Sequence, residues 1–193
     1  MDNPIKKHIQ HSIIEILLHL PQGNSFLMEN VSTHISGYFI QALYEALKNQ
    51  WTVNYLPVLM NLEEIEPAVF FPKVTEQLAD IIASSYPELQ PVFARESRAI
   101  DIVDFVYLTN KLIEKSIQNN YLPDSKPMKI VFILYNADVL DGFGQKFKED
   151  LNDLLKENIF SAVIVAKHLI SRKWESHAPH WLEPFRNDGL YKL

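Results

Sequence analysis

The 193-residue chain contains no cysteine, which excludes disulfide bonds, thiolate nucleophiles and thiolate metal sites. Only five glycines serve the whole length, so a glycine-rich phosphate-binding loop is not expected. No apolar run approaches the roughly 18 residues that a membrane-spanning helix needs. The first apolar stretch is interrupted by polar residues, unlike the core of a signal peptide. We therefore expect a cytoplasmic protein.

The chain also lacks an excess of positive charge. Its 24 acidic and 18 basic residues give a formal net charge of -6, which provides no general attraction for nucleic acid or for anionic membranes. We therefore expect neither of them as a partner. A hydrophobic fraction of 47% and a charged fraction of 22% are ordinary for a globular chain and exclude wholesale disorder. The length suits one sizeable core, so a single domain over residues 1–193 is predicted.

Several short apolar runs predict β-strands. Five consecutive apolar residues, Ile130 to Leu134, indicate a strand buried on both faces of a parallel sheet. Residues 161–166 predict a second buried strand, 25–28 a short one and 190–193 a last one. Residues 52–60 combine β-branched and aromatic side chains with a proline, which predicts an edge strand or a bulge.

Helical spacing of apolar residues alternates with these strands. The first predicted helix begins at Asn3-Pro4, a capping residue followed by proline. Strands that alternate with helices predict an α/β fold with a parallel, doubly wound sheet and helices on both faces. Residues 84–99 contain two prolines and predict a long surface connection. The helices are expected near residues 4–20, 36–48, 72–82, 101–118 and 143–157.

The end of the 130–134 strand carries an informative pair, Tyr135 and Asn136. In P-loop ATPases such a strand ends in an Asp that holds the magnesium shell, often followed by a Glu that polarises the attacking water. Neither Tyr135 nor Asn136 carries a negative charge at neutral pH, so neither can offset a divalent cation or accept a proton from water. Read on their own, the two residues are ordinary polar ends of a strand.

The order of the elements resembles the core of the STAND and AAA+ branch of P-loop ATPases. Residues 26–36 stand where that family has its phosphate loop, GxxxxGK[ST]. Glu29 and His34 occupy the glycine places, Ile35 the lysine place and Ser36 the hydroxyl place, so only Ser36 agrees. The resemblance implies a three-layer P-loop NTPase-like fold, with a mostly parallel sheet of about five strands and helices on both faces. It also implies that the winged-helix module that usually follows is missing.

These departures predict a degenerate site. Glu29 adds a carboxylate close to the expected phosphates and Ile35 removes the cation, an exchange that costs several kcal/mol in a partly desolvated pocket. We therefore expect no cofactor, no catalytic residue and no enzymatic activity. The resemblance then implies a non-catalytic regulatory or interaction module. It would be an inactive STAND-like scaffold or switch of bacterial signalling or defence, with a protein partner or attached effector domains.

Two alternatives stay open. The first is an unconventional nucleotide- or anion-binding sensor that uses Ser36 and a basic cluster of Lys167, His168, Arg172 and Lys173 near the expected carboxyl edge of the sheet. The cluster is equally a candidate for contact with a partner or for a solvated surface. The second alternative is a component of a DNA-handling AAA+ assembly, which rests on fold analogy.

Three aromatic residues near the C-terminus, Trp174, Trp181 and Phe185, form a candidate protein-docking surface. The same residues could instead cover the edge of the sheet. The sequence does not separate these two interpretations, because both need only clustered aromatic side chains.

No metal site is expected. Asp138 and Asp141 fall in a loop before a helix, where aspartate suits capping and turns, and we expect both side chains to be solvated. His177 and His180 have a three-residue spacing, but a zinc site needs at least a third ligand and Pro179 interrupts the segment.

Overall fold

The structure is a computed structural model that describes residues 4–29, 31–50, 53–90, 99, 101–118 and 128–168, together with the backbone of 185–192. The strands are β1 (Ser25–Glu29), β2 (Asn54–Asn61), β3 (Met128–Tyr135), β4 (Phe160–Val165) and β5 (Phe185–Lys192). The α-helices are α1 (Pro4–His19), α2 (Thr33–Lys48), α3 (Phe70–Ser85), α5 (Ile102–Gln118) and α6 (Gln145–Lys156). The predicted alternation of strands and helices is confirmed.

The strands form one parallel sheet in the order β2-β3-β4-β1-β5. Strands β2, β3, β4 and β1 make its packed core, and β5 adds along the outer edge of β1 with an irregular register. The buried strand predicted at 130–134 is β3, which lies between β2 and β4. Strand β2 lies at an edge, as Pro57 predicts, because a proline has no N–H for a second neighbour.

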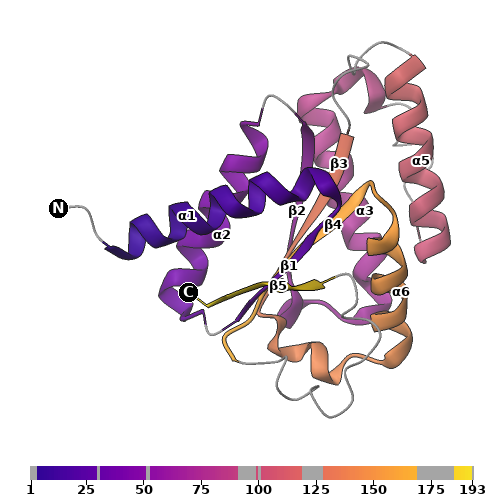
Figure 1. The fold of residues 1–193 in the computed structure, drawn as a ribbon. Helices are drawn as coiled ribbons and strands as arrows, with labels where there is room; N and C mark the ends of the chain where they lie inside the picture. Colours follow the sequence, from indigo (N-terminus) through magenta and orange to yellow (C-terminus); the bar gives the residue numbers. More distant parts are fainter. Residues whose placement is uncertain are drawn as a thin grey trace.

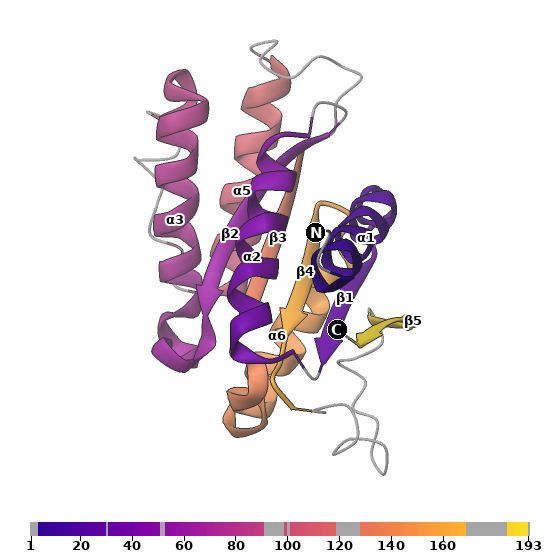
Figure 2. The same ribbon diagram turned by 90° about the vertical axis from the view of Figure 1, so that its left-hand side faces the viewer.

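The molecule has three layers (Figures 1 and 2). Helices α1 and α2 cover one face of the sheet, here called the α1/α2 face, and α3, α5 and α6 cover the other. Alternate residues of β3 serve the two cores: Val131 packs toward α1 and α2, whereas Ile130 and Phe132 pack toward the other helices. Both faces are therefore apolar, which explains the uninterrupted hydrophobic run in this strand.

A cluster of phenylalanines joins the sheet to the helices on the second face. The Phe132 ring lies 6.1 Å from Phe105 of α5, 6.4 Å from Phe70 of α3 and 6.0 Å from Phe160 of β4, measured between ring centroids. All four rings are fully buried. Rings at these separations pack favourably beyond the area they bury, so the cluster fixes the inner strands against α3 and α5.

Helix α1 is amphipathic, as its spacing predicts. Ile9 and Ile16 are buried against the sheet, whereas Lys6 is exposed. A short 3-10 turn follows the helix and ends at Gly23, which adopts a left-handed φ of 81°. A Cβ at Gly23 would lie 2.6 Å from Oδ1 of Asn158, so glycine meets both a conformational and a steric demand there.

The free edge of β2 is partly covered by a side chain. The amide of Gln77, on α3, accepts a hydrogen bond from Leu59 N at 3.0 Å and donates one to Leu59 O at 2.7 Å. The Gln77 amide thus makes the two backbone hydrogen bonds that a further strand would make at this position, which limits pairing of the edge with another chain. Because strand residues alternate, the backbones of Pro57 and Tyr55 point to the same edge as Leu59.

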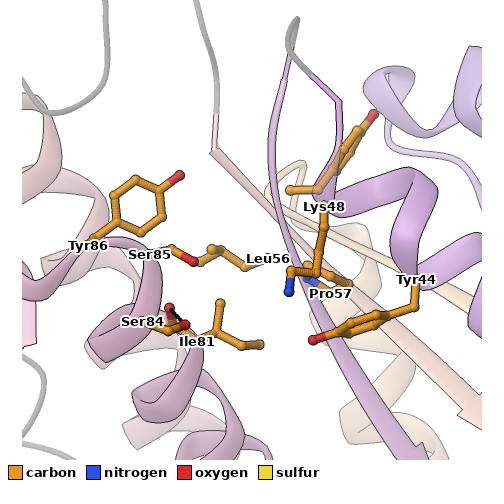
Figure 3. A pocket seen from close by; sticks show the side chains of 9 residues that line it. Tyr44, Lys48, Leu56, Pro57, Ile81, Ser84, Ser85 and Tyr86 are labelled. Atoms are coloured by element: carbon orange, nitrogen blue, oxygen red, sulfur yellow. Dashed lines mark hydrogen bonds between the residues drawn. The ribbon is translucent and has the colours of Figure 1, made fainter.

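A hollow of about 200 Å³ lies beside this part of β2 (Figure 3). Tyr44 and Lys48 of α2 stand on one side, and Ser84 of α3 stands on the other. Leu56 and Pro57 of β2 also line it. The hollow is thus a gap between the two helical layers at the open edge of the sheet.

The connection predicted to run over the surface at 84–99 is exposed at Ser84, Pro87 and Gln90, but two other described residues are buried. Leu89 is fully buried and Ala99 is 1% exposed, both within the core that contains α3 and α5. Apolar side chains that can reach this core outweigh the turn chemistry of the prolines.

Among the described residues, no helix combines the length and apolarity needed to span a membrane.

Candidate functional site

The residues matched to P-loop positions gather at the carboxyl edge of the sheet. The strands are parallel, so their carboxyl ends meet at one edge, which is where ligands of open α/β folds bind. Glu29 ends β1, Asn61 ends β2 and Tyr135 ends β3. Lys167 and His168 follow β4. The candidate site is therefore built from four strand ends.

The connection from β1 to α2 is short, because only residues 30–32 separate the two elements. Val31 is buried, and its N–H donates to Ala166 O at 3.2 Å. The N–H groups of Ile35 and Ser36 donate to Ser32 O at 3.0 and 2.8 Å. A phosphate-binding loop needs successive N–H groups turned toward the ligand, and these three are used inside the protein.

The other matched positions of this segment supply no cation. The Glu29 side chain is 3% exposed at the end of β1. His34 and Ile35 lie in the first turn of α2, and Ile35 is partly buried. The place of the usual lysine is thus held by an alkyl side chain, next to a strand that ends in a carboxyl group. This arrangement gives no neutralising charge for a triphosphate.

The end of β3 has a structural role that does not depend on charge. Asn136 adopts the left-handed conformation, with φ 53° and ψ 42°, which asparagine tolerates better than most residues. Its Nδ2 donates to Oδ1 of Asn61 at 2.8 Å, which joins the ends of β3 and β2. Burial, assisted by the charge of Glu64, raises the pKa of the Tyr135 hydroxyl. Tyr135 is therefore a neutral phenol at physiological pH.

The end of β2 extends this polar network. Asn61 Nδ2 donates to Oε1 of Glu64 at 2.6 Å, and Asn61 Oδ1 accepts from the N–H of Glu63 at 3.3 Å. The sequence interpretation assigned no role to these three residues. Their signal is the polar run Asn61-Leu-Glu-Glu64 directly after a predicted strand, which belongs at the carboxyl edge of a parallel sheet.

Asp138 joins the ends of β3 and β4. Its Oδ2 accepts from the N–H of Lys167 at 2.9 Å, and its Oδ1 accepts from the N–H of His168 at 2.9 Å. Oδ1 also lies 2.7 Å from Nδ1 of His168. The prediction that Asp138 is solvated is wrong, because its side chain is only 20% exposed. Asp141 is exposed, as predicted.

The environment of Asp138 favours its ionised form. Burial by itself would raise the pKa of the Asp138 carboxyl. The hydrogen bonds from the Lys167 N–H and from the imidazole and N–H of His168 outweigh burial, and together they lower that pKa. The carboxylate is therefore an internal anion held by donors of the segment that follows β4.

The basic residues of this edge already contact acids. Lys167 Nζ lies 3.4 Å from Oε1 of Glu63, across from the end of β2, and His168 contacts Asp138. The positive charge proposed for anion binding is thus partly offset by carboxylates of the chain. Among the described residues, no group of three or more His, Asp or Glu side chains could hold a metal ion.

Several predicted site residues cannot be placed in this geometry. Arg172, Lys173, Trp174 and Trp181 lie outside the described residues, as do His177 and His180. Phe185 begins β5, whose backbone alone is described. The docking surface and the outer half of the basic cluster therefore stay predictions.

A second surface feature lies beside the matched phosphate-loop residues. A groove of about 300 Å³ runs between the first turns of α1 and α2, here called the α1/α2 groove. Two of the matched residues, His34 and Ile35, line it. The set of lining residues is Ile5, Lys6, Ile9, His34, Ile35 and Tyr38.

Comparison with known proteins finds no family model and no curated protein that matches the sequence. Solved structures do match. A chain of Drosophila ORC bound to DNA has a TM-score of 0.53 and 14% identity, over 96% of this chain and 89% of that one. A chain of Drosophila ORC bound to GC-rich DNA and Cdc6 has a TM-score of 0.53 and 12% identity, over 98% of this chain and 56% of that one. The Aeropyrum pernix ORC1 protein in complex with DNA has a TM-score of 0.50 and 14% identity, over 100% of this chain and 44% of that one.

At such low identity the similarity establishes the fold, which is the α/β P-loop NTPase-like fold of AAA+ proteins. This chain spans about half of the matched chain in two of these three structures. The three matched structures all contain DNA. This finding corrects the prediction, made from net charge, that nucleic acid is not a partner. Total charge does not describe how charge is distributed over a surface.

Proposed function

We propose that the protein is a non-catalytic component of a DNA-handling AAA+ assembly. The observation that carries this proposal is the likeness, over almost the whole chain, to chains from ORC structures that contain DNA. The likeness is one of fold, so the association with DNA is transferred here by analogy. The proposed association with DNA replaces the expectation, made from the sequence, of a module that contacts only proteins.

The non-catalytic part of the proposal is supported by the carboxyl edge of the sheet. Ile35 stands in the place of the phosphate-binding lysine, and the β3 end carries Tyr135 and Asn136 instead of acids. The Asn136 amide is engaged by Asn61. At the matched positions the lysine and both acids are replaced, so the groups that usually position magnesium and activate water are not in their places.

An inactive STAND-like scaffold of bacterial signalling or defence is a second proposal. The same loss of catalytic residues supports it, because a domain kept for its shape does not need them. This role requires a protein partner and makes no demand on DNA. The two proposals therefore differ in whether the purified chain binds DNA by itself.

Fluorescence anisotropy tests the association with DNA. The 193-residue chain is titrated into labelled duplex and labelled single-stranded oligonucleotides at low and at physiological salt. We expect binding that weakens as salt rises, because counterions released from the phosphates carry the electrostatic part of the affinity. Absence of binding to both forms at low salt would contradict the proposal and favour the scaffold.

Hydrolysis is tested separately with magnesium and ATP or GTP. We expect phosphate release no faster than with heat-denatured protein, since no residue in the place of the magnesium-binding pair is acidic. Ser36→Ala serves as the control, because Ser36 is the one residue that agrees with the phosphate-loop pattern. Turnover that disappears in Ser36→Ala would overturn the non-catalytic proposal.

A further inference from the structure

The α1/α2 groove combines a buried floor with a partly exposed rim. Ile9 is 2% exposed and forms part of the floor, whereas Ile5 and Tyr38 are 50% and 48% exposed. Helices α1 and α2 lie on the same face of the sheet and cross each other (Figures 1 and 2). Both contribute exposed residues to the groove, which is therefore open to solvent. An apolar hollow with an exposed aromatic rim suits a flat, apolar ligand group.

The two segments that line the groove, residues 4–14 and 33–44, together contain lysines and no acidic residue, although the chain contains 24 acidic residues. Lys6 lines the groove and is exposed. The exposed basic side chains of this surface are Lys6, Lys7, His8, His11 and His34. The net charge of -6 therefore arises elsewhere in the chain.

We propose that the α1/α2 groove binds single-stranded DNA, with one unpaired base seated against Tyr38 and a neighbouring phosphate next to Lys6. This inference rests on the proposed function, because it names the surface through which DNA would be contacted. Base stacking on an aromatic ring together with a basic rim is the usual way in which proteins hold a single strand. The lysine supplies the phosphate contact and the hollow supplies the base contact.

A single strand fits this surface better than a duplex. In a duplex the faces of the bases are covered by stacking, so a concave apolar groove could reach one only after the base is extruded. Acids that lie more than about 8 Å from the groove would repel the strand only weakly at physiological ionic strength. The few lysines imply weak binding with a shallow dependence on salt. For each phosphate contact, the logarithm of the binding constant should fall by about 0.7 for every tenfold rise in salt concentration.

The test compares matched variants of the full chain in anisotropy titrations with a labelled single strand. We expect Lys6→Glu to weaken binding several-fold and to reduce the salt slope by about 0.7. Tyr38→Ala should weaken binding by about tenfold, whereas Tyr38→Phe, which keeps the ring, should bind like the unmodified chain. Lys146→Glu makes the same charge change on α6, in the opposite layer, and should leave the affinity unchanged.

The possible results separate this inference from the proposed function. If the unmodified chain binds DNA and both Lys6→Glu and Tyr38→Ala bind equally well, the groove is the wrong surface while the DNA association stands. Equal losses in Lys6→Glu and Lys146→Glu would likewise reject the groove in favour of general electrostatics. A preference for duplex with no effect of Tyr38→Ala would reject the seated base. If no form of DNA binds, both proposals fail. Thermal melts confirm that the exposed substitutions leave the fold intact.

Discussion

Polar groups at the two ends of the parallel sheet differ in whether they have hydrogen-bond partners. At the carboxyl edge, Asn136 bonds to Asn61, and Asp138 bonds to the N–H groups of Lys167 and His168. Each of these contacts joins the ends of two neighbouring strands. The edge where open α/β folds bind their ligands is thus bridged by hydrogen bonds within the chain.

At the amino-terminal side of the sheet, several polar atoms are buried without a partner. Tyr55 and Lys129 are neighbours in the β2–β3 register. The Tyr55 hydroxyl, Lys129 Nζ and Ser161 Oγ lie among the described residues and have no hydrogen-bond partner there. Burial raises the pKa of Tyr55 to about 12 and lowers the pKa of Lys129.

The difference shows where the polar residues of the sheet stabilise the fold. A satisfied hydrogen bond to a charged group contributes roughly 1.5–3 kcal/mol, whereas a buried polar group without a partner costs about 1–3 kcal/mol. Substitutions at the carboxyl edge should therefore destabilise the protein. Removal of one of these polar atoms without a partner should do the reverse.

Asp138→Ala should give the largest effect. It removes the acceptor for two backbone N–H groups and one imidazole, and we expect the free energy of unfolding to fall by about 3 kcal/mol. Urea denaturation measures this change. Asp80→Ala, at an exposed position of α3, is the control and should stay within about 0.5 kcal/mol. Equal effects at the two positions would show that the hydrogen bonds of Asp138 at the carboxyl edge do not stabilise the fold.

The contribution of Asp138 should also depend on pH. Its folded pKa lies below the value of about 3.9 in an unfolded chain, so the stabilisation is complete above that value. It is lost as the pH falls through the lower folded pKa. The stability difference between the unmodified chain and Asp138→Asn should therefore be constant near neutrality and shrink below about pH 4. A difference that grows in acid would show that the carboxylate is not the stabilising form.

Asn136 tests backbone and side chain separately. Asn136→Gly loses only the amide bond to Asn61, and we expect a loss of about 1 kcal/mol. Asn136→Ala keeps a Cβ in the left-handed region but loses the polar side chain that makes this conformation tolerable for asparagine, which brings the total to about 2 kcal/mol. Chemical denaturation of the two variants side by side gives the difference. If alanine were no worse than glycine, the positive φ would not contribute.

Lys129→Met should give the smallest change and the opposite sign. The substitution keeps an unbranched chain and removes a buried amine without a partner, so we expect a gain of about 1 kcal/mol near neutral pH. The unfolded state binds more protons at Lys129 than the folded state does, so the gain should diminish as the pH rises toward about 10.4. A loss of stability in urea denaturation would mean that the amine has a favourable partner.

The elements could be predicted from the sequence, but the bonds between strand ends could not. The run from Ile130 to Leu134 identified a buried strand, and Pro57 placed β2 at an edge. Both signals are local. The link between Asn61 and Asn136 depends on which strands are neighbours and in which register, which a local pattern does not contain. Asp138 resembled a turn residue because its partners follow β4, about 30 residues later in the chain.

The Asp138 carboxylate has a consequence for the constancy of this domain's shape. A free anion held at the same N–H groups would be present only in proportion to its concentration. Asp138 belongs to the chain, and its effective concentration beside Lys167 and His168 is set by a short tether and does not vary with the surrounding solution. The spacing of the β3 and β4 ends therefore does not depend on the concentration of any free anion.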